Sequence, residues 1–213
     1  MPNYCNNRLT IEGDASALAD FKKRNFAKND PNYDGLCFTM QELYPTPNEL
    51  LEMTSPVMWR GDEADEDGKK EFEKHVEGLL EKYGHTDWYN WRVRNWGCKW
   101  DASESCIVED SENVLSVEYD TAWAPNTGWV NFAAKVYPSL KFTLSFEEPG
   151  MAFCGVYTAQ GDDDDLVEGD LQWVDEYGAL VEWDSDKERW YVVGTNEIID
   201  DEDFYPSEHN PFI

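Results

Sequence analysis

Basic residues are scarce in this sequence, and the shortage excludes several classes of function. Lysine and arginine total 17 against 45 aspartates and glutamates, which gives a formal net charge of −28. A surface with this charge repels the phosphates of nucleic acids and of anionic lipids. We therefore expect no direct binding of nucleic acid and no binding to a membrane, and we expect any macromolecular partner to be basic.

The residue patterns of metal, cofactor and covalent chemistry are missing as well. The sequence has no CxxC pair, HxxxH pair, GxxxxGK phosphate loop, GxSxG elbow or protein-kinase motif, and GDDDD at 161–165 lacks the alternating ligands and terminal glutamate of an EF-hand. We expect no metal, no cofactor and no enzymatic activity. We also expect the widely spaced cysteines to be reduced, unreactive thiols packed as small hydrophobic side chains: Cys5, Cys37, Cys98, Cys106 and Cys154.

Long apolar runs are absent too. No stretch is apolar over the roughly 18 residues that a membrane-spanning helix needs, and MPNYCNNRL at the start has neither the basic residues nor the apolar run of a signal peptide. We therefore expect a soluble, cytoplasmic protein, and the sequence leaves its oligomeric state open. The hydrophobic content of 41% and the aromatic content of 15% are sufficient for a folded core.

The periodicity of the apolar residues predicts an α+β fold. Leu9 and Ile11 alternate with polar neighbours in a first strand, and Asp14 is the expected N-cap of a first helix. Further alternating strands are predicted over 113–123, 140–146 and 151–160. Between the first two of these, a second helix is expected after Asn126 or Thr127, with the following residues toward the core: Trp129, Phe132, Ala133, Val136 and Tyr137.

An insertion and an aromatic segment separate the first helix from the strand at 113–123. Residues 28–62 predict little regular structure, whereas 69–83 predict a helix that ends at Gly84 and has one apolar side, formed by Phe72, Val76, Leu79, Leu80 and Tyr83. Residues 87–100 are rich in aromatic side chains and predict the second strand. Its faces would carry Trp96, Cys98 and Trp100 on one side and Asn95, Gly97 and Lys99 on the other.

The resulting order of strand, helix, strand, strand, helix, strand is that of the ferredoxin-like βαββαβ unit, an antiparallel sheet with both helices on one face. We expect this domain over 1–160, with a helical insertion at 28–86, and an acidic, β-rich extension over 161–213. From Gln160 onward 18 acidic residues accompany 2 basic ones, so this last part carries more than half of the net charge.

Four segments resemble the landmarks of the YubB-like ferredoxin-fold proteins of phages and plasmids. They are MPNYCNNRLTIEG, NWGCKWDA, YDTAWAPNTGW and FEEPGMAFCG, and together they span residues 1–160. The resemblance implies a ferredoxin-like fold and an origin on a mobile element, and it supplies no catalytic residue.

The leading functional hypothesis concerns the acidic extension. Its aromatic residues predict an ordered platform that holds carboxylates in fixed positions, and such a platform suits the basic cleft of another protein. We expect a phage-encoded accessory protein that acts as an acidic, DNA-mimic-like inhibitor of a host or anti-phage defence protein. The expected binding residues are Asp162, Asp163, Asp164, Asp165, Glu168, Asp170, Asp175, Glu176, Asp200, Asp201, Glu202 and Asp203.

The alternative hypothesis is a tryptophan-lined pocket for a small ligand or an enzymatic reaction. Its expected lining is Asn95, Trp96, Lys99, Trp100, Asp101, Asp120 and Trp123. Two other interpretations of these residues stay open. The tryptophans can be core residues packed between sheet and helices, and Lys99 beside aromatic rings can bind single-stranded nucleic acid, although the aromatic-glycine signature of that module is absent.

Overall fold

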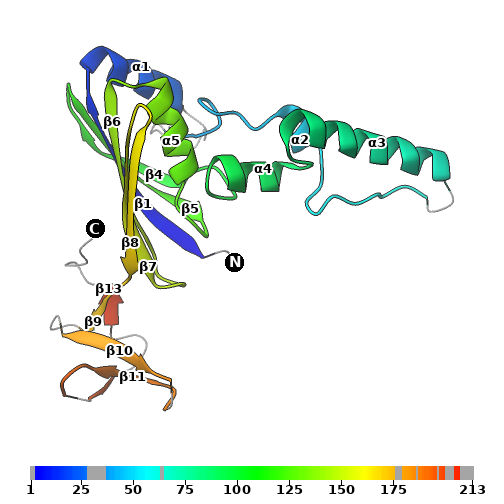
Figure 1. The fold of residues 1–213 in the computed structure, drawn as a ribbon. Helices are drawn as coiled ribbons and strands as arrows, with labels where there is room; N and C mark the ends of the chain where they lie inside the picture. Colours follow the sequence, from blue (N-terminus) through cyan, green and yellow to red (C-terminus); the bar gives the residue numbers. More distant parts are fainter. Residues whose placement is uncertain are drawn as a thin grey trace.

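The computed structural model describes residues 3–27, 37–62, 65–175, 179–185, 187–195, 197–199 and 204–206 (Figure 1). Its main sheet is antiparallel, with six strands in the order β4-β5-β1-β6-β7-β8. The bounds of these strands are β1 Tyr4–Gly13, β4 Ser103–Asp110, β5 Val114–Ala122, β6 Leu140–Glu148, β7 Phe153–Gln160 and β8 Asp163–Asp170.

Four of these strands and two helices form the ferredoxin-like unit. Along the chain they follow one another as β1, α1 (Ala15–Asn25), β4, β5, α5 (Thr127–Val136) and β6. Both helices pack on one face of the sheet, where the ring of Phe21 on α1 meets the rings of Trp129 on α5, of Tyr137 just after α5 and of Phe142 on β6. The expected fold class is confirmed.

The first strand and helix form as their residues predict. Residues of β1 alternate between the buried, helix-covered face, which holds Leu9 and Ile11, and the opposite face. Gly13 ends the strand, and the carboxylate of Asp14 accepts hydrogen bonds from the backbone N–H groups of Ser16 and Ala17 at 3.1 and 2.9 Å. These bonds satisfy two of the free donors at the helix start, so the predicted N-cap is confirmed.

The predicted strand over 87–100 is wrong. Residues Trp88–Asn95 form helix α4, which Asp87 caps by accepting the backbone N–H of Asn90 at 3.0 Å. Aromatic content favours strands only weakly, and here a helix N-cap and side chains spaced three to four residues apart decide the structure. Trp96 and Cys98 are buried after the helix end, but Trp100 is 38% exposed, so these three side chains share no strand face.

The second strand of the unit is instead β4, in a segment for which the sequence predicted no element. β4 pairs with β5 at the border of the sheet, with two irregularities in register. Most of its side chains are exposed, and Ile107 alone among its residues packs against the core as a hydrophobic side chain. A strand with so little apolar alternation gives almost no signal in sequence.

The insertion forms a helical arm that projects away from the sheet (Figure 1). It includes the short strand β3 (Cys37–Phe38), which pairs with β2 (Phe26–Ala27), and helices α2 (Asn48–Leu51) and α3 (Glu66–Tyr83). The predicted helix and its stop at Gly84, with φ of 71°, are confirmed. The predicted apolar side is only partly buried, since Leu79 is enclosed but Leu80 is 54% exposed.

The prediction for helix α5 is confirmed for Trp129, Ala133 and Tyr137, which are buried, and wrong for Phe132 and Val136. Trp129, Val130, Ala133 and Ala134 are buried, whereas Val136 is exposed and Phe132 lies half-buried at the boundary. The small alanines allow α5 to lie close to the sheet, where it contacts β6 and β7. The close packing of the Trp129 ring sets which side of the helix is buried, and the periodicity of the sequence alone does not reveal that side.

The acidic run after residue 160 continues the main sheet. Gly161 and Asp162 make a turn, and β8 then pairs with β7 from Asp163 to Asp170. A second sheet of five strands follows, in the order β12-β11-β10-β9-β13. Its bounds are β9 Trp173–Asp175, β10 Leu180–Asp184, β11 Arg189–Val192, β12 Ile198–Ile199 and β13 Phe204–Pro206.

Candidate functional site

The face of the main sheet opposite the helices is the candidate site. Alternation in β1 places Asn6, Arg8, Thr10 and Glu12 on this open face, while their neighbours face the helices. Because paired residues of adjacent strands point to the same side, the register assigns further residues to the face. They are Ser116, Glu118 and Asp120 on β5, Lys141, Thr143, Ser145 and Glu147 on β6, Val156 and Thr158 on β7, and Asp163, Asp165 and Val167 on β8.

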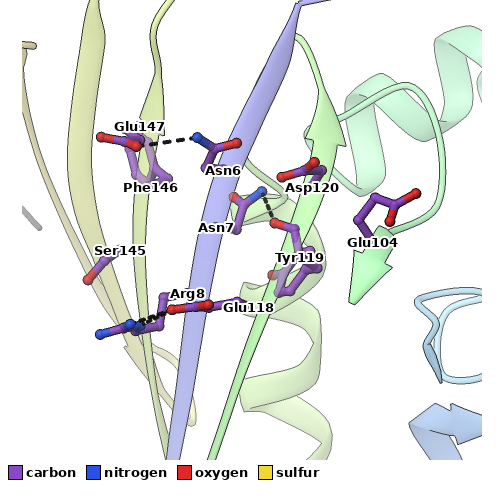
Figure 2. A pocket seen from close by; sticks show the side chains of 10 residues that line it. All are labelled: Asn6, Asn7, Arg8, Glu104, Glu118, Tyr119, Asp120, Ser145, Phe146 and Glu147. Carbon is purple, nitrogen blue, oxygen red and sulfur yellow. Dashed lines mark hydrogen bonds and ion pairs between the residues drawn. The ribbon is translucent and has the colours of Figure 1, made fainter. Parts of the chain in front are cut away.

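A hollow of about 410 Å³ lies on this face over β4, β5, β1 and β6 (Figure 2). Three strands and the first part of β4 supply its walls. The lining residues are Asn6, Asn7, Arg8, Glu104, Glu118, Tyr119, Asp120, Ser145, Phe146 and Glu147. Four of these ten side chains are carboxylates and one is a guanidinium, so the hollow carries net negative charge.

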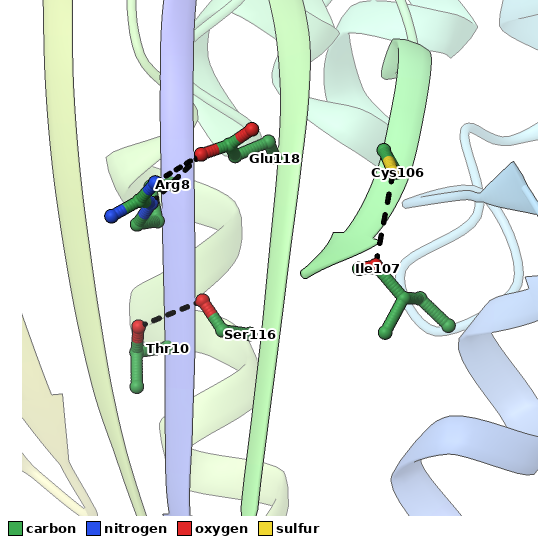
Figure 3. A network of polar contacts seen from close by, with 6 residues as sticks. All are labelled: Arg8, Thr10, Cys106, Ile107, Ser116 and Glu118. Atoms are coloured by element: carbon green, nitrogen blue, oxygen red, sulfur yellow. Dashed lines mark hydrogen bonds and ion pairs between the residues drawn. The ribbon is translucent and has the colours of Figure 1, made fainter. Parts of the chain in front are cut away.

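The guanidinium of this hollow is already paired. Arg8 lies opposite Glu118 in the register, and its Nε donates to Glu118 Oε1 at 2.9 Å (Figure 3). Next to this pair, the hydroxyls of Thr10 and Ser116 are 3.1 Å apart. On the same face, toward β6, the side-chain amide of Asn6 donates to Glu147 Oε1 at 3.3 Å. Arg8 therefore compensates one carboxylate of the hollow and leaves the remainder uncompensated.

Asp120 and Glu104 form the part of the hollow with the least compensation. Partial burial raises the pKa of Asp120, and the nearby carboxylate of Glu104 raises it further. Among the described residues no base forms an ion pair with either of them. An ammonium or guanidinium group brought between them would remove this repulsion, so the geometry suits a cationic group from a ligand or a partner.

Within the described ranges, no group of three or more histidine, cysteine, aspartate or glutamate side chains is placed to hold a metal ion.

The described residues distribute the members of the predicted tryptophan pocket over separate places. Asp120 lies in the hollow of the open face. Asn95 borders a second hollow beside α5, and Lys99 and Trp100 line a third beside Trp88 and Tyr89 of α4. Of the other members, Trp96 is fully buried, and the carboxylate of Asp101 accepts the backbone N–H of Met40. Trp123 is 47% exposed and has a φ of 72°.

The segment NWGCKW, which motivated that pocket, is a packing junction between two helices. The backbone N–H of Trp129 at the start of α5 donates to the carbonyl of Trp96 at 3.1 Å. A Cβ on Gly128 would lie 2.7 Å from the carbonyl oxygen of Asn95, and one on Gly97 would lie 2.7 Å from that of Pro125. Only glycines permit so close an approach, and the φ of 94° at Gly97 also favours glycine.

The same junction holds the start of the insertion against the core. The indole N–H groups of Trp96 and Trp129 donate to the carbonyls of Tyr44 and Met40 at 2.9 and 3.0 Å. The carboxylate of Asp101 accepts from the backbone N–H of Met40 at 2.7 Å and from other groups of the same turn. The core interpretation is thus correct for Trp96 and Trp129 and wrong for the exposed Trp100 and Trp123.

The predicted acidic binding residues fall in three groups. Asp162 lies in the turn before β8, and Asp163, Asp164, Asp165, Glu168 and Asp170 are exposed on β8 itself. Asp175 ends β9. Glu176, Asp200, Asp201, Glu202 and Asp203 lie outside the described residues.

The cysteines differ from one another in exposure. Cys5, Cys98 and Cys154 are buried, and burial raises the pKa of the Cys5 and Cys98 thiols well above the usual range. Cys106 is exposed on β4, where it lies opposite Glu118 on the open face (Figure 3). The expectation of packed thiols is therefore wrong for Cys106.

Sequence reasoning missed most of the open-face site. The residues it did not single out are Asn6, Arg8, Glu104, Glu118 and Glu147. The polar positions of NNRLTIE were the available signal, because they mark the side of the first strand that no helix covers.

A comparison with protein families places this architecture in a known class. Residues 95–192 match the family model described as the ferredoxin-like domain in Api92-like protein. The match runs from the end of α4 to the end of β11, and with the order of the sheet it assigns a ferredoxin-like domain to the chain.

One solved structure is similar over most of the chain, the crystal structure of protein api92 from Yersinia pseudotuberculosis. It has 9% sequence identity and a TM-score of 0.46, and the alignment covers 80% of this chain and 98% of that one. No curated protein matches the sequence. Among the described helices, none combines the length and the apolar composition needed to cross a membrane.

Proposed function

We propose that this protein acts by binding, without catalysis, and that the uncovered surface of its main sheet binds the basic surface of a partner protein. The observation that supports this is the charge of the open face. Its two bases, Arg8 and Lys141, already face Glu118 and Glu12. The carboxylates left without a described base are Glu104, Asp120, Glu147, Asp163 and Asp165.

A pleated sheet holds these carboxylates in fixed positions. Alternate side chains on one strand are about 7 Å apart, and neighbouring strands are about 5 Å apart, so the open face is a regular array of negative charge. Such an array attracts a basic protein over a distance and speeds association, and it repels nucleic acid and anionic lipid. A cleft that binds phosphates in the partner is the natural complement.

The proposed class of partner combines this charge with the resemblance to YubB-like proteins, which implies an origin on a phage or plasmid. On that basis the chain is an accessory protein of a mobile element that acts in the host cytoplasm as a DNA-mimic-like inhibitor of a host or anti-phage defence protein. The competing small-ligand or enzymatic function loses support, because the residues proposed for its pocket lie in separate places.

The test compares two variants that lose the same charge. One carries Glu104→Gln, Asp120→Asn and Glu147→Gln on the open face. The control carries Glu71→Gln, Glu73→Gln and Glu77→Gln, all exposed on α3. Affinity capture from host cells, followed by binding measurements on the captured protein at several salt concentrations, should show weaker binding for the open-face variant alone.

The thiol of Cys106 reports where the partner binds. Because it is exposed beside Glu118, a partner on the open face should slow its modification by a thiol reagent. If the open-face variant binds its partner as tightly as the unmodified protein at low salt, and Cys106 stays reactive in the complex, the proposal is wrong.

A further inference from the structure

Strand β8 is an edge of the main sheet as the described residues form it. It is the last strand in the order, and within the described part of the chain it pairs with β7 alone. Seven of its eight residues are exposed, and Gly169 is half-buried. A terminal strand directs alternate N–H and C=O groups outward, where they are free to pair with another extended chain. The opposite edge differs, since at β4 the hydroxyl of Ser105 accepts the backbone N–H of Phe38 on β3.

Carboxylates occupy both sides of this edge. Asp163 and Asp165 lie on the open face, opposite Gln160 and Thr158, whereas Asp164, Glu168 and Asp170 point to the helix-covered side. Of these, Asp164 also accepts a hydrogen bond from Asn131 on α5 at 3.1 Å. A second copy of β8 would place like charges side by side, so the edge disfavours pairing with itself.

The need to avoid self-pairing does not explain the two exposed apolar residues in the middle of β8. Leu166 and Val167 are adjacent and point to opposite sides, with exposures of 44% and 48%. A strand that only had to stay soluble would carry charge at its centre, where pairing with another strand begins most easily. An apolar centre with a charged rim is instead the composition of a binding surface.

We infer that β8 is the docking edge for one extended segment of the partner, with lysine or arginine toward both ends and apolar residues in the middle, which adds to the sheet as a seventh strand. The inference rests on the proposed function and specifies how the partner binds. Main-chain hydrogen bonds along β8 hold the segment, Leu166 and Val167 contact its apolar centre, and the flanking carboxylates select basic side chains.

The test uses a synthetic peptide with lysines flanking a central Val-Val pair. Control peptides carry proline in place of the valines, which keeps the charge and blocks strand pairing, or glutamate in place of the lysines. Binding is measured at low salt to the intact chain, to a β8 variant with Asp163→Asn, Asp165→Asn, Glu168→Gln and Asp170→Asn, and to an α3 variant with Glu71→Gln, Glu73→Gln, Glu77→Gln and Glu81→Gln.

The lysine peptide should bind the intact chain and the α3 variant alike and should bind the β8 variant about 30-fold more weakly, which is the ordinary effect of four exposed charge pairs. The proline and glutamate peptides should bind far more weakly than the lysine peptide. Hydrogen exchange should show slower exchange of alternate β8 amides in the complex, because those amides become bonded to the peptide.

The outcomes separate this inference from the proposed function. Equal binding of the lysine and proline peptides, or protection of Cys106 without protection of β8 amides, would overturn the docking edge and leave the open face as the binding surface. The same conclusion would follow if the lysine peptide did not bind the intact chain while the open-face variant failed to bind the natural partner. If the β8 amides exchange more slowly in the complex while the open-face variant binds the partner with unchanged affinity, β8 is the docking edge and the open face is not the binding surface.

Discussion

Replacing Trp129 with alanine should lower the free energy of unfolding by about 4 kcal/mol, the usual cost of truncating a fully buried tryptophan. The side chain of Trp129 has no exposed surface. Its ring meets those of Phe21 and Phe38 at centroid separations of 6.2 and 5.3 Å, and its indole N–H donates to the carbonyl of Met40 at 3.0 Å. The substitution removes both the ring contacts and one of the two N–H groups that donate to the Met40 carbonyl, the other being that of Tyr44 at 3.1 Å.

Two companion variants separate these contributions. Trp129→Phe keeps most of the ring contacts and loses the N–H, so it should cost about 1–2 kcal/mol through the lost hydrogen bond and the smaller ring, since the Met40 carbonyl keeps the N–H of Tyr44. Trp123→Ala removes a ring that is 47% exposed and should cost about 1 kcal/mol or less. Urea unfolding followed by circular dichroism measures all three. A loss below about 1 kcal/mol for Trp129→Ala, or one equal to that of Trp123→Ala, would refute the packing described for α5.

Three further predictions concern other parts of the structure. Gly128→Ala should destabilise the fold by at least about 1 kcal/mol in urea unfolding, since its Cβ would meet the Asn95 carbonyl at 2.7 Å, whereas Gly78→Ala, with nothing within 4 Å, should not destabilise it. Cys106 should react quickly with a thiol reagent in the native protein and Cys98 only on unfolding; equal rates would contradict the difference in exposure. Because folding raises the pKa of Asp120, ionisation of this side chain opposes folding once the pH rises above its ordinary pKa. Asp120→Asn should therefore raise the melting temperature at neutral pH and have no such effect at acidic pH. An equal difference in melting temperature at both pH values would contradict the raised pKa.

The elements predicted correctly from sequence are those whose own residues determine their structure. The alternation of Leu140, Phe142, Leu144 and Phe146 matches the buried side of β6, and Gly84 stops α3 as expected. The failures occur where tertiary pairing supplies the stability. β4 and β8 have almost entirely exposed side chains, so their strand structure comes from hydrogen bonds to β5 and β7.

The candidate site was harder to predict because it depends on register between distant segments. Arg8 meets Glu118 across 110 positions of sequence, and Asn6 meets Glu147 across 141. Nothing near Arg8 in the sequence identifies these partners. The tryptophans of NWGCKW attracted the pocket hypothesis because large aromatic side chains mark ligand sites and cores alike, and only burial distinguishes the two.

The central position of β1 has a consequence for how the chain folds during synthesis. β1 is synthesised before both of its neighbours in the sheet, β5 and β6, which lie more than a hundred residues further along the chain. Its backbone has neither of these strand partners, and its apolar residues Leu9 and Ile11 stay uncovered, until β5 and β6 have left the ribosome. The nascent chain therefore carries an unpaired strand throughout that interval, and chaperone binding at β1 should persist until β6 has emerged.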